Sequence, residues 1–331
     1  MTFGGVLGAT TAALVAATVT LSVPVSTRAA DLPVFGFQSD GSPTSVIGMS
    51  AAALGSVGVD GLNLTGPGRV SVPTSQDRAQ LFAAHRAGLP AVLLVGNFSD
   101  RINDFSEPLA HATLGRPPAI ARVVDALATN VRAGGWNGIS VDLESLTVRD
   151  RPGLAAFVAG LRHALPTDDS LTVTVMNETS PGDYRSAGYD LAALARSADQ
   201  LVLMAYDQHG PWENTPGPIG ALAWQRAGLH AILEIVPAAK VDLGVAGYGY
   251  AWRPHANLQL SDAGARRLVA RSGAHARWVP SAGEWTATLP DGSTVWWSDR
   301  RSLALRLRLA ASIKLHGLAV WSLGLSDPIT A

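Results

Sequence analysis

The chain has 331 residues, of which 47% are hydrophobic and 15% are charged, so it can bury a large core and does not have the composition of a disordered protein. Lys plus Arg total 25 and Asp plus Glu total 26, a net charge of -1, and no basic stripe with interleaved aromatic residues points to nucleic-acid binding. The absence of cysteine excludes disulfides, thiolate catalysis and Cys-ligated metal sites.

The first thirty residues have the composition of a targeting segment. Residues 6–25 are almost all Ala, Val, Leu, Thr and Gly, and the small residues at 26–31 suit a cleavage site. No Lys or Arg precedes the apolar run, which is close to the ~20 residues needed to span a membrane. We expect residues 1–30 to be a signal peptide, with an uncleaved anchor as the alternative, and the protein to be secreted or held at the cell envelope. No later apolar stretch is long enough to span a membrane.

Short β-branched runs alternate with helical patterns through the rest of the chain. Most of these runs are continuously apolar, which is typical of parallel strands buried on both faces. The expected strands are 34–37, 61–64, 91–95, 138–142, 171–176, 200–206, 241–247 and 317–321. The expected helices include 75–87, 119–133, 152–165, 191–195, 224–235 and 302–315, with Asp150 available as a cap for the third of these.

Eight such units predict an α/β fold, a closed (β/α)₈ barrel, over residues 31–331. The alternative is a doubly wound open sheet, which would normally carry a glycine-rich phosphate turn after its first strand. One segment, at about 253–300, interrupts the rhythm with a helix at 261–271 and strand-like pieces at 276–279, 285–289 and 294–298. A Pro-Asp-Gly-Ser turn separates the last two, so we expect a small α+β insertion on the barrel rim.

Two carboxylates follow the fourth expected strand. If 138–142 is a strand, then Ser140, Asp142 and Glu144 share one face and point toward the C-terminal mouth of the barrel. Catalytic residues of such barrels come from these strand ends. Two carboxylates this close repel each other, so one stays protonated to higher pH and suits proton donation. The alternative is a solvated strand end or a salt bridge to a nearby Arg.

Two further groups of polar and aromatic residues follow the sixth and eighth expected strands. After the sixth, Met204, Tyr206 and Asp207 are followed by His209 and Trp212, which could line a cleft or simply pack in the loop. The eighth ends at Trp321, either a core residue or a flat apolar floor under a sugar ring. Asn177, just after the fifth, is a further candidate for the cleft.

These motifs together resemble glycoside hydrolase family 18, the chitinase-like family, over roughly residues 33–327. The family pattern after strand four, D-G-x-D-x-D-x-E, stands here at 137–144 with Asp142 and Glu144 kept. Asn137 and Ser140 replace its two outer aspartates. The strand-six pattern M-x-Y-D and the Trp that ends strand eight are intact, and the rim insertion also fits. The bacterial branch related to spore-cortex and peptidoglycan hydrolases is the most similar.

The resemblance implies a substrate-assisted retaining mechanism, the exception known for this family. Glu144 would protonate the glycosidic oxygen and later act as base toward water. Asp142 would orient the 2-acetamido group that attacks the anomeric carbon, Tyr206 would hydrogen-bond its oxygen, and Asp207 would help hold the ring. Met204, Trp212, Trp321, Ser140 and Asn177 are the expected substrate-binding residues.

The Ser140 replacement is the departure with chemical consequences. In full-motif members the aspartate at this position can share a proton with its neighbour. A serine can hydrogen-bond Asp142 but cannot take its charge, so we expect activity with a different pH profile.

The expected substrate is a polysaccharide that contains N-acetylglucosamine, either chitin or peptidoglycan, with no metal and no organic cofactor. The alternative function is a catalytically weak or silent carbohydrate-binding relative, but such relatives typically lose the glutamate that is present here as Glu144. A barrel enzyme of unrelated chemistry finds no support, because G-x-S-x-G, P-loop and H-E-x-x-H motifs are missing from the sequence.

Overall fold

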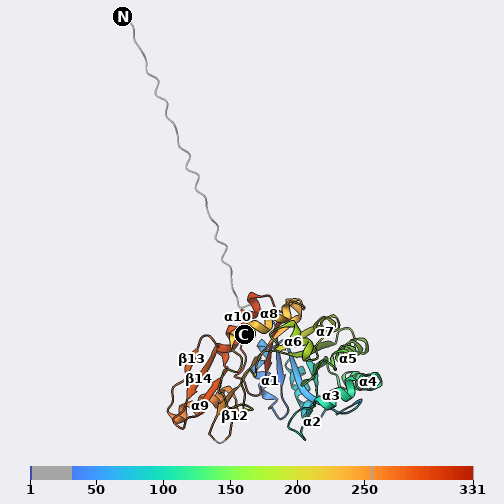
Figure 1. The fold of residues 1–331 in the computed structure, drawn as a ribbon, viewed down its shortest axis with the longest axis horizontal. Coiled ribbons are helices and arrows are strands. Elements are labelled where there is room, and N and C mark those ends of the chain that lie inside the picture. The colour runs from blue at the N-terminus through green and yellow to red at the C-terminus, as the bar shows by residue number, and fades with distance from the viewer. Residues whose placement is uncertain (2–31, 255, 331) are drawn as a thin grey trace.

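The computed structural model describes Met1, residues 32–254 and residues 256–330 (Figure 1). The expected signal peptide or anchor lies outside the described residues. Within the part of the chain that is described, no helix is both long and apolar enough to cross a membrane.

Eight parallel strands close into a barrel (Figure 1). In chain order they are β1 Val34–Gln38, β2 Ser56–Gly66, β4 Ala91–Gly96, β7 Gly138–Asp142, β8 Ser170–Met176, β9 Gln200–Met204, β10 Val241–Ala246 and β16 Gly317–Trp321. β1 pairs in parallel with both β16 and β2, which closes the ring. The predicted barrel is therefore confirmed, and the open doubly wound sheet is excluded.

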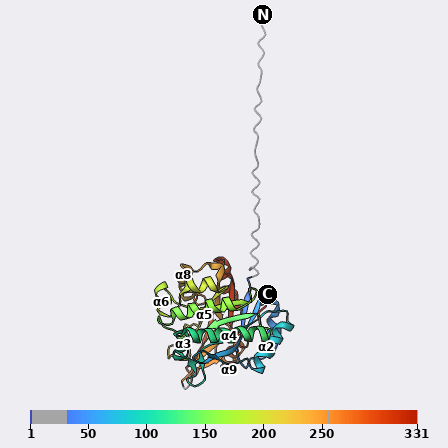
Figure 2. The same cartoon turned by 90° about the vertical axis from the view of Figure 1, so that its right-hand side faces the viewer.

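Helices cover the outside of the barrel (Figure 2). They are α1 Ser45–Ser50, α2 Ser75–Arg86, α3 Glu107–Leu114, α4 Pro117–Gly134, α5 Arg151–Ala164, α6 Pro181–Ser186, α7 Leu191–Ser197, α8 Leu222–Leu233 and α10 Arg300–Ser312, with short 3₁₀ turns at Ala51–Ala53 and Ala238–Lys240. The amphipathic α4 begins with Pro in its first turn and ends at Gly135, whose φ of 75° favours glycine. The six helices expected from the sequence are all present, with ends within two or three residues.

The hydrogen bonds of Asp150, the residue expected to cap α5, differ from those of a helix cap. Asp150 occupies the N-cap position, but its side chain makes no capping hydrogen bond to the helix. Its carboxylate instead accepts hydrogen bonds from the backbone N and Oγ1 of Thr147, at 2.9 and 3.0 Å, and lies 2.7 Å from Nδ1 of His111. Asp150 therefore ties the preceding turn to α3, because its oxygens point back along the chain.

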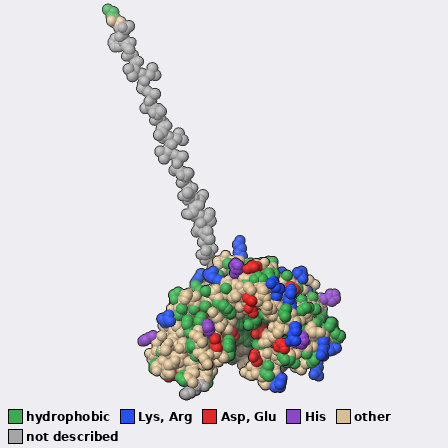
Figure 3. Space-filling view, in the orientation of Figure 1, with side chains coloured by type: hydrophobic (Ala, Val, Ile, Leu, Met, Phe, Trp, Pro, Cys, Tyr) green, Lys and Arg blue, Asp and Glu red, His purple; other side chains and the backbone are tan. Residues whose placement is uncertain are grey.

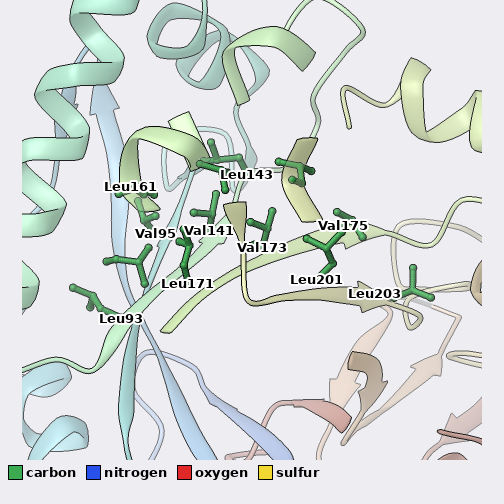
Figure 4. Packing of buried hydrophobic residues seen from close by; sticks show 14 of the residues in the cluster. Leu93, Val95, Val141, Leu143, Leu161, Leu171, Val173, Val175, Leu201 and Leu203 are labelled. Carbon is green, nitrogen blue, oxygen red and sulfur yellow. The ribbon is translucent and has the colours of Figure 1, made fainter. Parts of the chain in front are cut away.

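The strands are continuously apolar because both of their faces are buried. Outward-facing residues such as Leu93, Val141 and Val173 pack with Leu161 of α5 in the layer between barrel and helices (Figure 4). The inward-facing residues form a second cluster that fills the barrel: Phe35, Phe37, Val92, Leu94, Val202 and Ala319, with Trp321 packed against it. The polar side chains of interest lie above this inner cluster, at the C-terminal ends of the strands.

The α+β insertion lies between β10 and α10, beside the barrel mouth (Figure 1). It is a five-stranded antiparallel sheet with α9 Asp262–Ser272 packed on it. Its strands are β11 Gly249–Trp252, β12 Leu258–Leu260, β13 Arg277–Val279, β14 Glu284–Thr288 and β15 Thr294–Trp297. It begins at Gly249, a few residues before the expected 253. Two short hairpin pieces, β5 Phe98–Ser99 and β6 Asp104–Phe105, follow β4, and β3 Arg69–Val70 follows β2.

Candidate active site

Asp142 is the last residue of β7, and it is buried. Its Oδ1 accepts a hydrogen bond from Oγ1 of Thr174 on β8, at 2.5 Å. Burial raises the pKa of Asp142 to about 6, and the Thr174 hydrogen bond to the charged form opposes part of this rise. Asp142 can therefore gain or lose a proton close to neutral pH.

Glu144 follows β7 by two residues, and its backbone is fixed from both sides by one side chain. The amide of buried Asn97 accepts from Glu144 N and donates to Glu144 O, each at 2.9 Å. Burial raises the pKa of Glu144 well above its ordinary value, and the charges of Asp142, Asp207 and Asp104 raise it further. A carboxyl in these surroundings holds its proton near neutral pH, as a general acid must.

Asp207 lies in the segment after β9 Gln200–Met204, with a left-handed φ of 59°. Its Oδ1 accepts hydrogen bonds from the phenol groups of Tyr248 and Tyr250, at 2.5 and 2.8 Å. Burial raises the pKa of Asp207, while these two hydrogen bonds lower it by stabilising the carboxylate. The two tyrosines therefore orient Asp207 and favour its charged form.

The charges of Asp142 and Glu144 act on two tyrosines, Tyr206 and Tyr189. Burial raises the pKa of Tyr206, and the charges of Asp142 and Glu144 add to it. Burial also raises the pKa of the buried Tyr189, and the charge of Glu144 and then that of Asp142 raise it further. Both phenols therefore stay protonated at neutral pH and are available as hydrogen-bond donors.

Aromatic side chains surround the mouth. Trp321 ends β16, with its ring centroid 5.7 Å from that of Phe37, and the buried Met204 ends β9. A cluster that contains Tyr248 and Tyr250 continues this surface onto the insertion. Trp212 is 64% exposed at the rim and meets Tyr250 edge to face. In Figure 3 the molecule is hollowed between the insertion and the barrel, with acidic side chains around the hollow.

Two of the expected substrate-binding residues lie elsewhere. Ser140 is fully buried beneath Asp142, and its hydroxyl has no hydrogen-bond partner among the described residues, so the expected bond to Asp142 comes from Thr174 instead. Asn177 lies against α8, where its Nδ2 donates to the carbonyl of Trp224 at 3.3 Å and its Oδ1 approaches Gly228. Neither position supports a contact with substrate, so we omit both residues from the proposed site.

Sequence reasoning missed several residues of the mouth. Tyr248 and Tyr250 follow the seventh barrel strand with the alternation of a strand, a signal that could have placed both on one face. Asn97 and Thr174 belong to neighbouring strands or strand ends, and only the register of the barrel relates them to Glu144 and Asp142. Asp60 of β2 was missed in the same way.

One group of metal-ligand type occurs among the described residues, formed by Glu107, His111 and Asp150. It lies on α3 and at the start of α5. Its members already have partners, since Arg149 pairs with Glu107 at 2.9 Å and His111 with Asp150 at 2.7 Å. These contacts explain the group without a metal.

Comparisons with known proteins agree on one family. The model named "Glycosyl hydrolases family 18" matches residues 74–325. An uncharacterized glycosylase, YvbX, of Bacillus subtilis is 26% identical over 255 residues, which span 74% of each chain. A cortical fragment-lytic enzyme of Bacillus subtilis is 24% identical over 245 residues, 68% of this chain but only 55% of that protein.

Solved structures resemble the whole described fold. A chitinase from Chromobacterium violaceum superimposes with a TM-score of 0.81 at 29% identity, over 90% of this chain and 96% of that one. The Bacillus cereus spore cortex-lytic enzyme SleL superimposes with a TM-score of 0.80 at 19% identity, over 90% of this chain and 72% of that one. The second likeness concerns the fold alone.

Proposed function

Because the chain belongs to glycosyl hydrolase family 18 and is a glycosidase, we propose that it cleaves β-linked N-acetylglucosamine polymers with Glu144 as general acid and base. The observation that carries the proposal is the surroundings of Glu144: a partly buried carboxyl at the barrel mouth, two residues from the ionisable Asp142. Such surroundings hold a carboxyl in its acid form at neutral pH, while its neighbour can carry the charge.

The proposed reaction has two steps. In the first, Glu144 gives its proton to the glycosidic oxygen as the bond to the anomeric carbon breaks. The carbonyl oxygen of the substrate's own 2-acetamido group attacks that carbon and forms an oxazolinium ion. Asp142 accepts a hydrogen bond from the acetamido nitrogen and offsets its positive charge, Tyr206 donates to the acetamido oxygen, and Asp207 holds the ring.

In the second step water attacks the same carbon from the face that the leaving group vacated. Glu144, now a carboxylate, takes a proton from this water, and the oxazolinium ring opens back to the acetamido group. Two inversions at one carbon give net retention of configuration. The sugars stack on the apolar faces of Trp321 and the rim residue Trp212, with the buried Met204 at the end of strand β9.

Glu144→Gln tests this assignment. Because the amide keeps the shape but cannot donate an acidic proton, we expect kcat on an N-acetylglucosamine oligomer to fall by about 10²–10⁴-fold while binding persists. Glu178→Gln is the matched control, since Glu178 follows the neighbouring strand β8 and is outside the proposed site. A wild-type protein that binds the oligomer but is as inert as the Glu144→Gln variant would instead favour the alternative, a silent carbohydrate-binding relative.

The choice between chitin and peptidoglycan is a question of products. Both a chitinase and a cortical fragment-lytic enzyme are similar to this chain. Purified chitin oligomers and purified peptidoglycan, digested in parallel and analysed by mass spectrometry, would identify the substrate. Efficient cleavage of deacetylated glucosamine oligomers would contradict the substrate-assisted step.

We also propose that the protein works outside the cytoplasm. The proposal depends on the composition of residues 1–30 and on the polymeric wall substrates, which lie outside the membrane. Expression of the full chain with fractionation of medium, envelope and cytoplasm tests it, and N-terminal sequencing of the mature protein distinguishes a cleaved signal from an anchor.

A further inference from the structure

Asp60 of β2 faces the inside of the barrel. A side chain on Gly58, two residues earlier, would meet the rings of Phe37 and Phe35, which belong to the inner cluster. Because side chains alternate along a strand, Asp60 points to the same side as Gly58. Gly61, the next residue, faces outward to Asp77 of α2.

The register of the barrel relates Asp60 to Asp142. Asp60 pairs with Leu94 of β4, and Leu94 pairs with Ser140 of β7. In an eight-stranded barrel each strand is shifted along the barrel axis by about one residue relative to its neighbour. The residue at the same height two strands away therefore lies two positions further along its strand than the residue reached through the hydrogen-bonded pairs. The residue level with Asp60 is therefore Asp142, two residues beyond Ser140.

The same rule, applied to the remaining strands of the barrel, identifies the other side chains at the height of Asp60 and Asp142. Thr174 pairs with Val202, which puts Met204 level with Asp142. Gly244 pairs with both Met204 and Ala319, which puts Trp321 at this height. The topmost inner layer thus consists of four side chains from alternate strands: Asp60, Asp142, Met204 and Trp321. Asp60 is the one member that the family motifs do not include.

Ser140 belongs to a deeper layer, directly below Asp142 on the same strand. Its hydroxyl carries no charge, so the carboxyl that the fuller motif has at this place is missing. We propose that Asp60 supplies this carboxyl from across the barrel, so that Asp60 and Asp142 hold one proton between them. This inference depends on the proposed function, and it makes Asp60 a positioning residue that acts through Asp142.

The electrostatic surroundings of Asp60 agree with this role. Burial, then the charge of Asp142, and then those of Asp40 and Asp77, raise the pKa of Asp60 to about 7. Among the described residues, the charged groups that act on Asp60 are these three carboxylates, from β7, the segment after β1, and α2. Asp142 ionises first, since its pKa is about 6, and its charge then retains the proton on Asp60.

The pH profile of kcat/KM tests the proposal. In a cluster of carboxyls the last proton is lost at a higher pH because the others are already charged. Asp60→Asn removes one of these charges, so the alkaline limb of the profile should move down by about 0.5–1 pH unit. A profile identical to that of the wild type would overturn the proposal.

Rescue variants test the position of the carboxyl. Asp60→Asn combined with Ser140→Asp returns a carboxyl to the motif position and should restore the alkaline limb. Asp60→Asn with Asn137→Asp is the matched control, because Asn137 lies at the opposite end of β7, where its Oδ1 accepts from Ala91 N at 2.9 Å and lies 2.9 Å from His85 Nε2. Failure of Ser140→Asp to rescue, or equal rescue by Asn137→Asp, would overturn the proposal.

A direct titration keeps this test separate from that of the proposed function. In ¹³C NMR of carboxyl-labelled aspartate, the pKa of Asp60 should fall in Asp142→Asn, because the charge that retains its proton is gone, and Asp142 should titrate in a single step in Asp60→Asn, because its coupled partner is gone. The second variant carries the test if the first does not fold. An inactive wild type with these two changes would overturn the proposed function alone, whereas an active wild type without them would overturn the role of Asp60 alone.

Discussion

Asn97 fixes Glu144, the proposed general acid, through the backbone rather than through its carboxyl. β7 ends at Asp142, so the ladder no longer holds Glu144, and the next residue, Ser145, has a left-handed φ of 56°. The amide of Asn97 replaces the lost ladder by bonding both backbone groups of Glu144, and its Nδ2 also donates to Ser106 O at 3.1 Å. The position of the proposed proton donor is thus set by a side chain that need not touch substrate.

Replacing Asn97 with Ala should therefore lower kcat more than it raises KM. Misplacement of the acid by a fraction of an ångström costs about 10–100-fold in rate, while the apolar binding surface is unchanged. Steady-state kinetics on an N-acetylglucosamine oligomer measure both parameters. Asn63→Ala is the matched control, because the Asn63 side chain accepts from Phe98 N at 2.9 Å and makes no hydrogen bond to Glu144 among the described residues. Equal loss of kcat in the two variants would contradict this role for Asn97.

At the residue scale, what the sequence could predict depended on distance along the chain. Asp142 and Glu144, or Tyr206 and Asp207, are neighbours, so strand periodicity alone relates them. Asp60 lies 82 positions before Asp142, and the register that makes them level depends on the stagger of three strands. The expected hydrogen bond from Ser140 to Asp142 is absent from the described structure, because alternation gives the face of the strand on which Ser140 lies but not its depth.

At the scale of elements, a buried ion pair joins the barrel to the insertion. Arg306 of α10 donates to Gly283 O at 2.7 Å and to Gly220 O at 2.6 Å, and it pairs with Glu284 of β14 at 3.1 Å. Glu284 in turn accepts from the backbone N of Ile219 and Gly220, at 2.8 and 2.9 Å. These bonds hold the segment that leads from Asp207 to α8 against the insertion. Because this segment forms one wall of the mouth, the ion pair also fixes that wall.

Arg306→Met should therefore destabilise the fold strongly. The change leaves the Glu284 charge and two carbonyls buried without their partner, which costs about 3–5 kcal/mol. Urea unfolding followed by circular dichroism measures the difference. Arg266→Met is the control, since Arg266 and Asp327 form an ion pair whose side chains are 43% and 25% exposed, and such pairs contribute about 1 kcal/mol or less. Similar losses in the two variants would show that burial of the Arg306 pair adds nothing.

The elements themselves were largely predictable. All eight barrel strands and the six expected helices follow from apolar runs and helical periodicity, which a closed barrel repeats in order along the chain. The insertion's first strand was missed because Gly249–Trp252 continues the apolar stretch of β10 without a long break. Asp150 was assigned to the wrong partner because a cap and a preceding turn demand the same residue types.

At the scale of the whole molecule, the mouth concentrates carboxyls that folding must bury. Asp60, Asp142, Glu144 and Asp207 all have raised pKa values, with burial as the largest cause in each. An exposed aspartate in the unfolded chain ionises near pH 3.8, so between that value and the folded pKa the folded state holds more protons. Stability from these groups is therefore greatest in acid and falls as the pH rises through this range.

Asp60→Asn should accordingly stabilise the protein at neutral and alkaline pH. At pH 4 Asp60 is protonated in the folded state and only partly ionised in the unfolded chain, so wild type and variant should unfold at similar temperatures. Above pH 7, the wild type must bury a charge or keep a proton that the unfolded chain has released, which costs about 1.4 kcal/mol for each unit by which the folded pKa exceeds the unfolded one. The variant's Tm should therefore exceed that of the wild type by a few degrees at pH 8, measured by calorimetry across pH 4–8.

Because an asparagine that simply packs badly would lower Tm equally at every pH, the pH dependence of the difference distinguishes ionisation from packing. A difference that shrinks as the pH rises would contradict a raised pKa for Asp60.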